Sequence, residues 1–133
     1  LAYVQLEGLK EMIPFTQLGQ AFASTFHLYC LLYAEKPDIL LVDEIENGIY
    51  YQGLSDFWKG LHATIQDRDT QLFATTHSFE CMRAAHEQAK ALDCEYPINF
   101  IRLDRHPVSG KIVATEFGED EMEAAISNHW DMR

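Results

Sequence analysis

The residues best suited to chemistry in this chain are two adjacent carboxylates, Asp43 and Glu44, which directly follow the aliphatic run I-L-L-V at residues 39–42. A short, wholly apolar run is typical of a strand buried on both faces of a parallel sheet. Acidic side chains do not belong inside such a sheet, so we expect both carboxylates at its carboxyl end, where open α/β sheets bind ligands. There one carboxylate can hold Mg²⁺ while its neighbour orients or deprotonates a water molecule.

A histidine, His77, is the second residue of chemical interest, because it also follows a short apolar segment, residues 71–75. One helix is expected between the two strands. In a right-handed strand–helix–strand unit the two strand ends lie side by side. We therefore expect His77 to face the same crevice as Asp43 and Glu44.

These residues need a scaffold, and the hydrophobic periodicity predicts one in which strands and helices alternate. The predicted helices cover about residues 18–34, 52–66, 78–92 and 119–129, and the predicted strands cover residues 39–43, 71–75, 98–103 and 111–117. Such an order indicates an α/β fold, a parallel sheet flanked by helices, in a single domain of residues 1–133. The last two strands are expected to form a terminal hairpin at one edge of the sheet, followed by the final helix.

The composition fits one compact domain, with 133 residues, 15.3 kDa and 47% hydrophobic residues. A formal net charge of −11 argues against direct binding to a nucleic-acid backbone, which needs clustered Lys and Arg. Three cysteines without metal-ligand spacing fit a reducing cytoplasm, and no apolar run approaches the roughly 18 residues of a membrane span. A run of acids near the end is expected to form a solvated helix face: Glu116, Glu119, Asp120, Glu121 and Glu123.

Two segments together resemble a known family. I-L-L-V-D-E-I-E-N-G at residues 39–48 and Q-L-F-A-T-T-H-S-F-E-C at residues 71–81 look like the C-terminal lobe of an ABC-type ATPase. Within that group they are most similar to the AAA family ATPases of the SMC/RecF and OLD-nuclease type. The resemblance covers about residues 14–117, and it implies a P-loop NTPase-like fold of which this chain is the C-terminal half.

The resemblance implies a role for each matching residue in hydrolysis. Asp43 resembles the Walker B aspartate, which binds Mg²⁺, usually through water. Glu44 resembles the general base that positions the attacking water, and His77 resembles the switch histidine that contacts the γ-phosphate. The segment Glu46–Asn47–Gly48 corresponds to the start of the loop that faces the other subunit of a dimer.

Leu18-Gly19-Gln20-Ala21 lies where the family has its signature motif, although the motif is degenerate here. In the family this motif lies at the N-terminus of a helix and touches the nucleotide held by the opposite subunit. Gly19 and Gln20 occupy this place. A helix N-terminus attracts phosphate because its backbone N–H groups are unpaired and the helix dipole favours negative charge there. The family usually has a glycine where Ala21 stands and often an acid at the position of Gln20. A methyl group at Ala21 would hinder close approach of the backbone to a phosphate.

The largest departure from the family is the absence of a P-loop, since no G-x-x-x-x-G-K-[ST] occurs in the sequence. We therefore expect this chain to be the C-terminal portion of a larger ATPase and to hydrolyse no ATP without an N-terminal P-loop lobe. The resemblance implies ATP and Mg²⁺ as cofactors and a homodimer of heads. It also implies coupling to a nucleic-acid or effector partner and no membrane.

Other functions remain open at this stage. The domain could be an ATPase-derived interaction module without activity, or a nuclease with an acidic metal site made by Asp43, Glu44 and Glu46. Weaker alternatives pair His77 with Glu80 as metal ligands or with Cys81 as a nucleophile.

Overall fold

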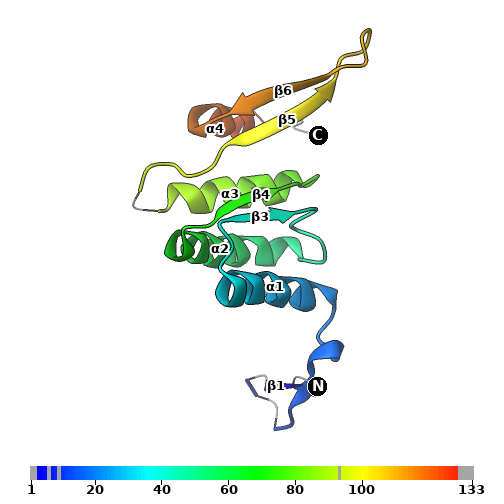
Figure 1. The fold of residues 1–133 in the computed structure, drawn as a ribbon, viewed down its shortest axis with the longest axis vertical. Helices are drawn as coiled ribbons and strands as arrows, with labels where there is room; N and C mark the ends of the chain where they lie inside the picture. The colour runs from blue at the N-terminus through cyan, green and yellow to red at the C-terminus, as the bar shows by residue number, and fades with distance from the viewer. Residues whose placement is uncertain (1–2, 6, 9, 93, 129–133) are drawn as a thin grey trace. The chain divides into compact units, whose positions relative to one another are not determined.

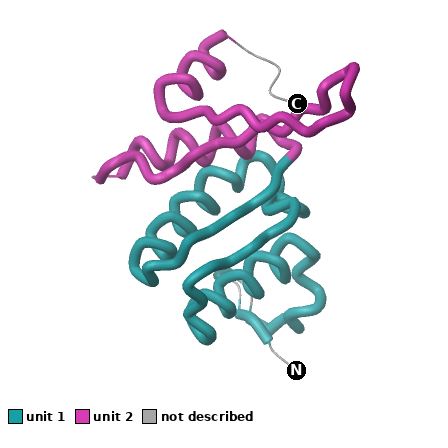
Figure 2. Tube along the Cα trace, turned by 45° about the horizontal axis from the view of Figure 1, so that its top comes forward, with its two compact units in different colours: residues 1–76 teal, residues 77–133 magenta. Residues whose placement is uncertain are grey.

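The computed structural model describes residues 3–5, 7–8, 10–92 and 94–128, and the chain divides into two compact units, Leu1–Thr76 and His77–Arg133 (Figure 2). The predicted α/β class is confirmed, because helices and strands alternate along the chain (Figure 1). The expectation of a single domain stays a prediction. Within the described ranges no helix is long and apolar enough to cross a bilayer.

Unit 1 contains the strand–helix–strand segment that carries the two carboxylates. A small antiparallel pair, β1 and β2, precedes it, and a short 3₁₀ helix, η1, leads to the first long helix. The elements are β1 (Tyr3–Val4), β2 (Ile13–Pro14), η1 (Phe15–Gln17), α1 (Gln20–Cys30), η2 (Leu31–Glu35, a π-helical end of α1), β3 (Ile39–Val42), η3 (Tyr51–Gly53), α2 (Leu54–Arg68) and β4 (Gln71–Ala74).

The strands β3 and β4 pair in parallel, as the sequence predicts, with Leu41 opposite Phe73 (Figure 1). Their burial differs from the prediction. Leu40, Val42 and Leu72 on one face are partly buried, whereas the other face carries Ile39, Leu41 and Phe73 with exposed fractions of 58%, 75% and 50%. The expectation of a strand buried on both faces is therefore wrong for the described chain. The reason is that two strands alone leave one apolar face without cover.

The helices of unit 1 follow from their apolar periodicity. Buried side chains of α1 and its π-helical end, Leu28 and Leu32, and of α2, chiefly Leu54, Phe57 and Leu61, supply the core of this unit. The aromatic residues of α1 are only partly covered. Phe22 and Phe26 remain 39% and 44% exposed, although both rings contact Phe15 of η1 at centroid distances of 5.3 and 4.7 Å.

Unit 2 consists of α3 (Phe79–Lys90), the hairpin β5 (Phe100–Arg105) and β6 (Ile112–Phe117), and α4 (Glu119–Ser127). Ser78 caps α3 by accepting a hydrogen bond from the N–H of Cys81, as the sequence predicts. Met122 and Ala125 of α4 are fully buried, and Phe100 and Phe117 of the hairpin pack against them. Among the described strands β5 pairs with β6 alone, so the expectation that the hairpin extends the parallel sheet is wrong. The hairpin obtains its apolar cover from α4.

Candidate functional site

Asp43 and Glu44 lie at the carboxyl end of β3, where the sequence places them, and both are exposed. One hydroxyl group holds them there. Thr75, the residue after β4, accepts a hydrogen bond from the backbone N–H of Glu44 at 2.9 Å and donates one to Oδ1 of Asp43. A single side chain therefore attaches both the carboxylate of Asp43 and the backbone of Glu44 to the neighbouring strand.

The backbone of Glu44 is in the left-handed region, with φ of 48°. Among the described residues only two other non-glycine residues share this conformation, Lys36 and Asp69, and both directly follow the end of a helix. A left-handed residue is common at a helix end, but Glu44 follows a strand. The conformation costs about 1–2 kcal/mol for a residue with a Cβ, and such strain in folded proteins gathers at functional sites.

A cavity of about 250 Å³ lies beside the two carboxylates. Its walls come from α1, from the end of β3 and the turn that follows, and from α2: Ser24, Thr25, Leu28, Val42, Asp43, Glu44, Ile45, Asn47, Ile49 and Phe57. All of these residues belong to unit 1. The carboxylates thus meet a small, partly polar hollow, in which water or the end of a ligand could be held.

The segment Gly19–Gln20, which the sequence relates to the signature motif, lies next to the same turn. Gly19 precedes α1 with φ of 86° and ψ of 167°, a conformation essentially confined to glycine, and it has no side chain to cap the helix. A Cβ added to Gly48 would lie 3.0 Å from the backbone nitrogen of Ala21 and 3.4 Å from its methyl group. The methyl group of Ala21 therefore lies on the side of this turn, and Gln20 is exposed at the start of α1.

His77 is the first residue of unit 2, and its side chain is exposed. The structure describes each unit by itself, so the expected approach of His77 to Asp43 and Glu44 stays a prediction. Its neighbour in sequence, Ser78, opens α3 as described above, and Oγ of Ser78 also contacts Glu80 at 3.2 Å.

No group of three or more His, Cys, Asp or Glu residues that could hold a metal ion occurs in the described part of the chain. One weaker alternative, the Cys81–His77 pair, loses support from burial. Cys81 is fully buried, and a nucleophile must reach its substrate, so a Cys81–His77 catalytic pair is disfavoured.

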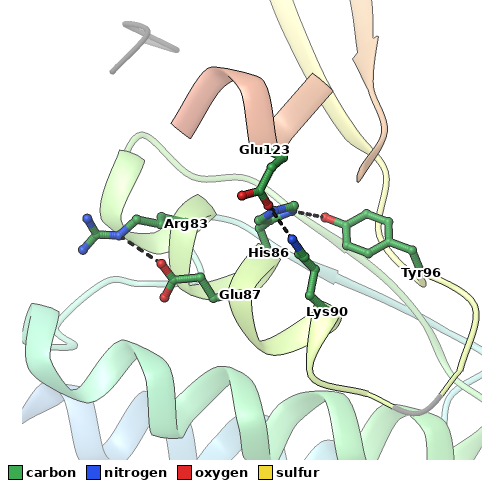
Figure 3. A network of polar contacts seen from close by, with 6 residues as sticks. All are labelled: Arg83, His86, Glu87, Lys90, Tyr96 and Glu123. Atoms are coloured by element: carbon green, nitrogen blue, oxygen red, sulfur yellow. Dashed lines mark hydrogen bonds and ion pairs between the residues drawn. The ribbon is translucent and has the colours of Figure 1, made fainter. Parts of the chain in front are cut away.

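A second polar cluster lies within unit 2 and centres on His86 of α3, whose exposed fraction is 1% (Figure 3). Its Nδ1 lies 2.7 Å from the hydroxyl of Tyr96, and its Nε2 lies 3.1 Å from Oε2 of Glu123 on α4. Lys90 donates to the same oxygen of Glu123 at 2.5 Å. Because an ionised carboxylate only accepts, Nε2 of His86 donates to Glu123, and in a neutral ring Nδ1 then accepts from Tyr96.

Charges in this second cluster shift the pKa values of its members in consistent directions. The hydrogen bond from Lys90, followed by that from His86, lowers the pKa of Glu123, and Glu123 raises the pKa of Lys90. Burial, followed by the negative charges of Glu119 and Glu123, raises the pKa of Tyr96 to about 12. Tyr96 therefore keeps its proton at ordinary pH.

Sequence reasoning missed Thr75 as a member of the site. The apolar run places Thr75 at the end of the predicted strand 71–75 and indicates no further role for it. The available signal was its position: it directly follows the apolar segment of β4, as Asp43 directly follows that of β3, and Val42 pairs with Ala74 in the observed register. Equivalent positions on paired parallel strands bring their side chains together.

Two comparisons with known proteins give matches to this chain, and a third gives none. No family model matches the chain. A curated Helicobacter pylori protein named "ATP/GTP phosphatase" is 26% identical over 80 residues, covering 58% of this chain and 22% of that protein, so the chain spans under a quarter of its length.

A solved structure described as "Structural biochemistry of ATP-driven dimerization and DNA stimulated activation of SMC ATPases" aligns with a TM-score of 0.62. The alignment covers 92% of this chain and 68% of that chain at 9% identity. The chain has an ATPase-like fold. The expected resemblance is thus confirmed at the level of the fold, while the roles of individual motif residues stay predictions.

Proposed function

We propose that this chain forms the water-activating part of an ATP-hydrolysing head of the ABC type, and that its two units belong to one such head. The observation that carries the proposal is the position of Asp43 and Glu44. They are adjacent carboxylates at the carboxyl end of a parallel strand, beside a cavity, and Glu44 is held in a strained backbone conformation. The name of the curated relative supports the same chemistry.

The residues at this strand end fit a magnesium nucleotide. Mg²⁺ usually binds through one or two carboxylates, waters and substrate phosphates rather than through a cage of protein ligands. Asp43 suits this arrangement, because Thr75 engages only its Oδ1 and the side chain is exposed. When bound, the metal neutralises charge that develops on the phosphates.

Within the proposed mechanism each residue of this chain has a separate task. Asp43 would hold Mg²⁺, through water, and Glu44 orients the attacking water and accepts its proton. His77 donates to the γ-phosphate. Gly19 and Gln20 at the start of α1 present backbone N–H groups to the nucleotide of a second head, where the helix dipole favours an anion.

The proposal requires a P-loop lobe to hold the phosphates. Support comes from the exposed apolar row Ile39, Leu41 and Phe73, since parallel strands are normally covered on both faces. We propose that such a lobe covers this row and that two heads dimerise around ATP. Hydrolysis would be coupled in the cytoplasm to a nucleic-acid or effector partner.

The test is a comparison of Glu44→Gln with Glu35→Gln in the protein that includes its P-loop lobe. Glu35 is also exposed, but it lies at the π-helical end of α1. We expect Glu44→Gln to lower kcat by about 10²–10⁴-fold, since it removes a general base, while ATP still binds. Glu35→Gln should leave kcat unchanged. Equal turnover of wild type and Glu44→Gln would refute the proposed role of Glu44.

The alternative is an ATPase-derived interaction module without activity, which the absent P-loop sequence and Ala21 favour. The two functions differ in one measurement, the binding of Mg²⁺–ATP by the protein with all its domains. An inactive module binds no nucleotide at concentrations at which the ATPase is saturated.

A further inference from the structure

We propose that Thr75 is a positioning residue for hydrolysis, because its hydroxyl sets the geometry of both Asp43 and Glu44. The inference rests on the proposed function and assigns a role to a residue outside the motif positions. Thr75 contacts neither metal nor phosphate in this proposal. It acts through the two carboxylates.

The hydrogen-bond directions at Thr75 follow from the chemistry of its partners. The backbone N–H of Glu44 can only donate, so Oγ1 of Thr75 accepts it, at 2.9 Å. An ionised Asp43 can only accept, so the hydroxyl proton of Thr75 points to its Oδ1. A hydroxyl group can do both at once, whereas a methyl group can do neither.

The backbone of Thr75 strengthens the same attachment. Its N–H donates to the carbonyl of Val42 at 2.9 Å, and its carbonyl accepts from the N–H of Ile45 at 3.1 Å. Thr75 therefore contacts four consecutive residues of the β3 end. The two backbone bonds fix Val42 and Ile45, on either side of the acidic pair, and the hydroxyl fixes the carboxylate of Asp43 and the backbone of Glu44.

This attachment has two consequences for the reaction. The N–H of Glu44 is held while its φ is 48°, so the hydroxyl helps to keep Glu44 in its strained conformation and to direct its side chain. The bond to Oδ1 of Asp43 fixes the carboxylate plane and leaves Oδ2 for metal-bound water. Partners that orient a metal-binding carboxylate typically affect activity or metal affinity by about 10–100-fold when they are removed.

The experiment compares Thr75→Val, Thr75→Ala and Thr75→Ser in the protein that includes its P-loop lobe. Val keeps the size and branching of Thr but lacks the hydroxyl, and Ser keeps the hydroxyl. We expect Val and Ala to lower kcat about 10–100-fold with little change in KM for ATP and with a higher Mg²⁺ requirement, and Ser to restore most of kcat. Thr115→Val, at an exposed position of β6, is the matched control and should behave as wild type.

Two further readouts separate positioning from general loss of structure. Amide hydrogen exchange at Glu44 should be faster in Thr75→Val and near wild type in Thr75→Ser, while exchange in the β3–β4 ladder stays slow. In a Glu44→Gln background Thr75→Val should lower kcat by a much smaller factor than in wild type, because the two residues act as a unit. If Thr75→Val lowers kcat by the same factor in both backgrounds, the inference is overturned.

The outcomes also separate this inference from the function on which it rests. If Glu44→Gln abolishes turnover but Thr75→Val and Thr75→Ala keep wild-type kcat, the role of Thr75 is wrong and the proposed function stands. If Glu44→Gln leaves turnover unchanged, the proposed function is wrong and the positioning role is lost with it. If Ser fails to restore activity in a folded protein, the hydroxyl is not the positioning group.

Discussion

The two polar clusters of this chain differ in burial and in strain. In unit 1 the carboxylates of Asp43 and Glu44 are exposed, and one of them is on a residue with φ of 48°. In unit 2 His86 is buried, with both ring nitrogens in hydrogen bonds, and it joins α3 to α4 (Figure 3). The first arrangement lowers stability, through backbone strain at Glu44, and places reactive groups at the surface. The second gives the buried His86 hydrogen-bond partners and stabilises its unit.

Among the variants that test this contrast, His86→Ala should have the largest effect on the free energy of unfolding. The change leaves a cavity and removes the partner of Tyr96, so the free energy of unfolding should fall by about 3 kcal/mol. Urea unfolding measures the loss, and hydrogen exchange in α3 and α4 locates it. The exposed His27 provides the control, because His27→Ala should change stability by less than about 0.5 kcal/mol. If folded His86→Ala protein loses ATP hydrolysis, the cluster around His86 is not purely stabilising and the contrast is wrong.

Glu44→Gly should have a smaller effect and should raise, rather than lower, the free energy of unfolding. Glycine adopts positive φ without strain, so the stability of the chain should rise by up to about 1 kcal/mol while hydrolysis is lost. Lys36→Gly and Asp69→Gly, at the two other left-handed positions, should give similar stabilisation with unchanged hydrolysis. Thermal unfolding and turnover of the three variants provide the measurements. A destabilising Glu44→Gly would show that its backbone conformation is not strained.

The smallest effect is a pH dependence of unit 2 through Glu123. Its folded pKa lies below the ordinary value of 4.5, chiefly because Lys90 donates to it. The stabilisation is therefore present above pH 4.5 and is lost as the pH falls through the lowered pKa. It is small, because the carboxylate is exposed to solvent. Urea midpoints between pH 3 and 7 should fall less steeply with acid in Glu123→Gln than in wild type or Glu35→Gln. Parallel pH profiles for all three proteins would contradict the assigned role of Glu123.

Much of the fold was predictable from sequence, because local periodicity determines most of its elements. The run at residues 39–42 and the run at residues 71–75 predicted the parallel strands, and Ser78 predicted the start of α3. The strand end that holds Asp43 and Glu44 follows from the same pattern. These predictions depend on neighbours in sequence, which is where propensities and caps operate.

The errors concern contacts that no local pattern specifies. The separate sheet of β5 and β6 depends on apolar cover from Met122, and the exposed row at Leu41 depends on which segments lie over the sheet. The sequence around His86 does not distinguish it from other helical histidines, because its partners Tyr96 and Glu123 reach it only in the folded chain. Thr75 was missed for the same reason, since its partners are 31 and 32 residues away in sequence.

The sequence separation between Thr75 and Glu44 also has a consequence for folding order. The hydroxyl can reach the backbone of Glu44 only after β4 has paired with β3, which requires closure of the segment that contains α2. Before that step the hydrogen bond from Glu44 to Thr75 is absent, and only the local turn, in which Asn47 donates to the carbonyl of Glu44, constrains its backbone. The arrangement of the carboxylates therefore forms late, and a partly folded chain with native helices still lacks it.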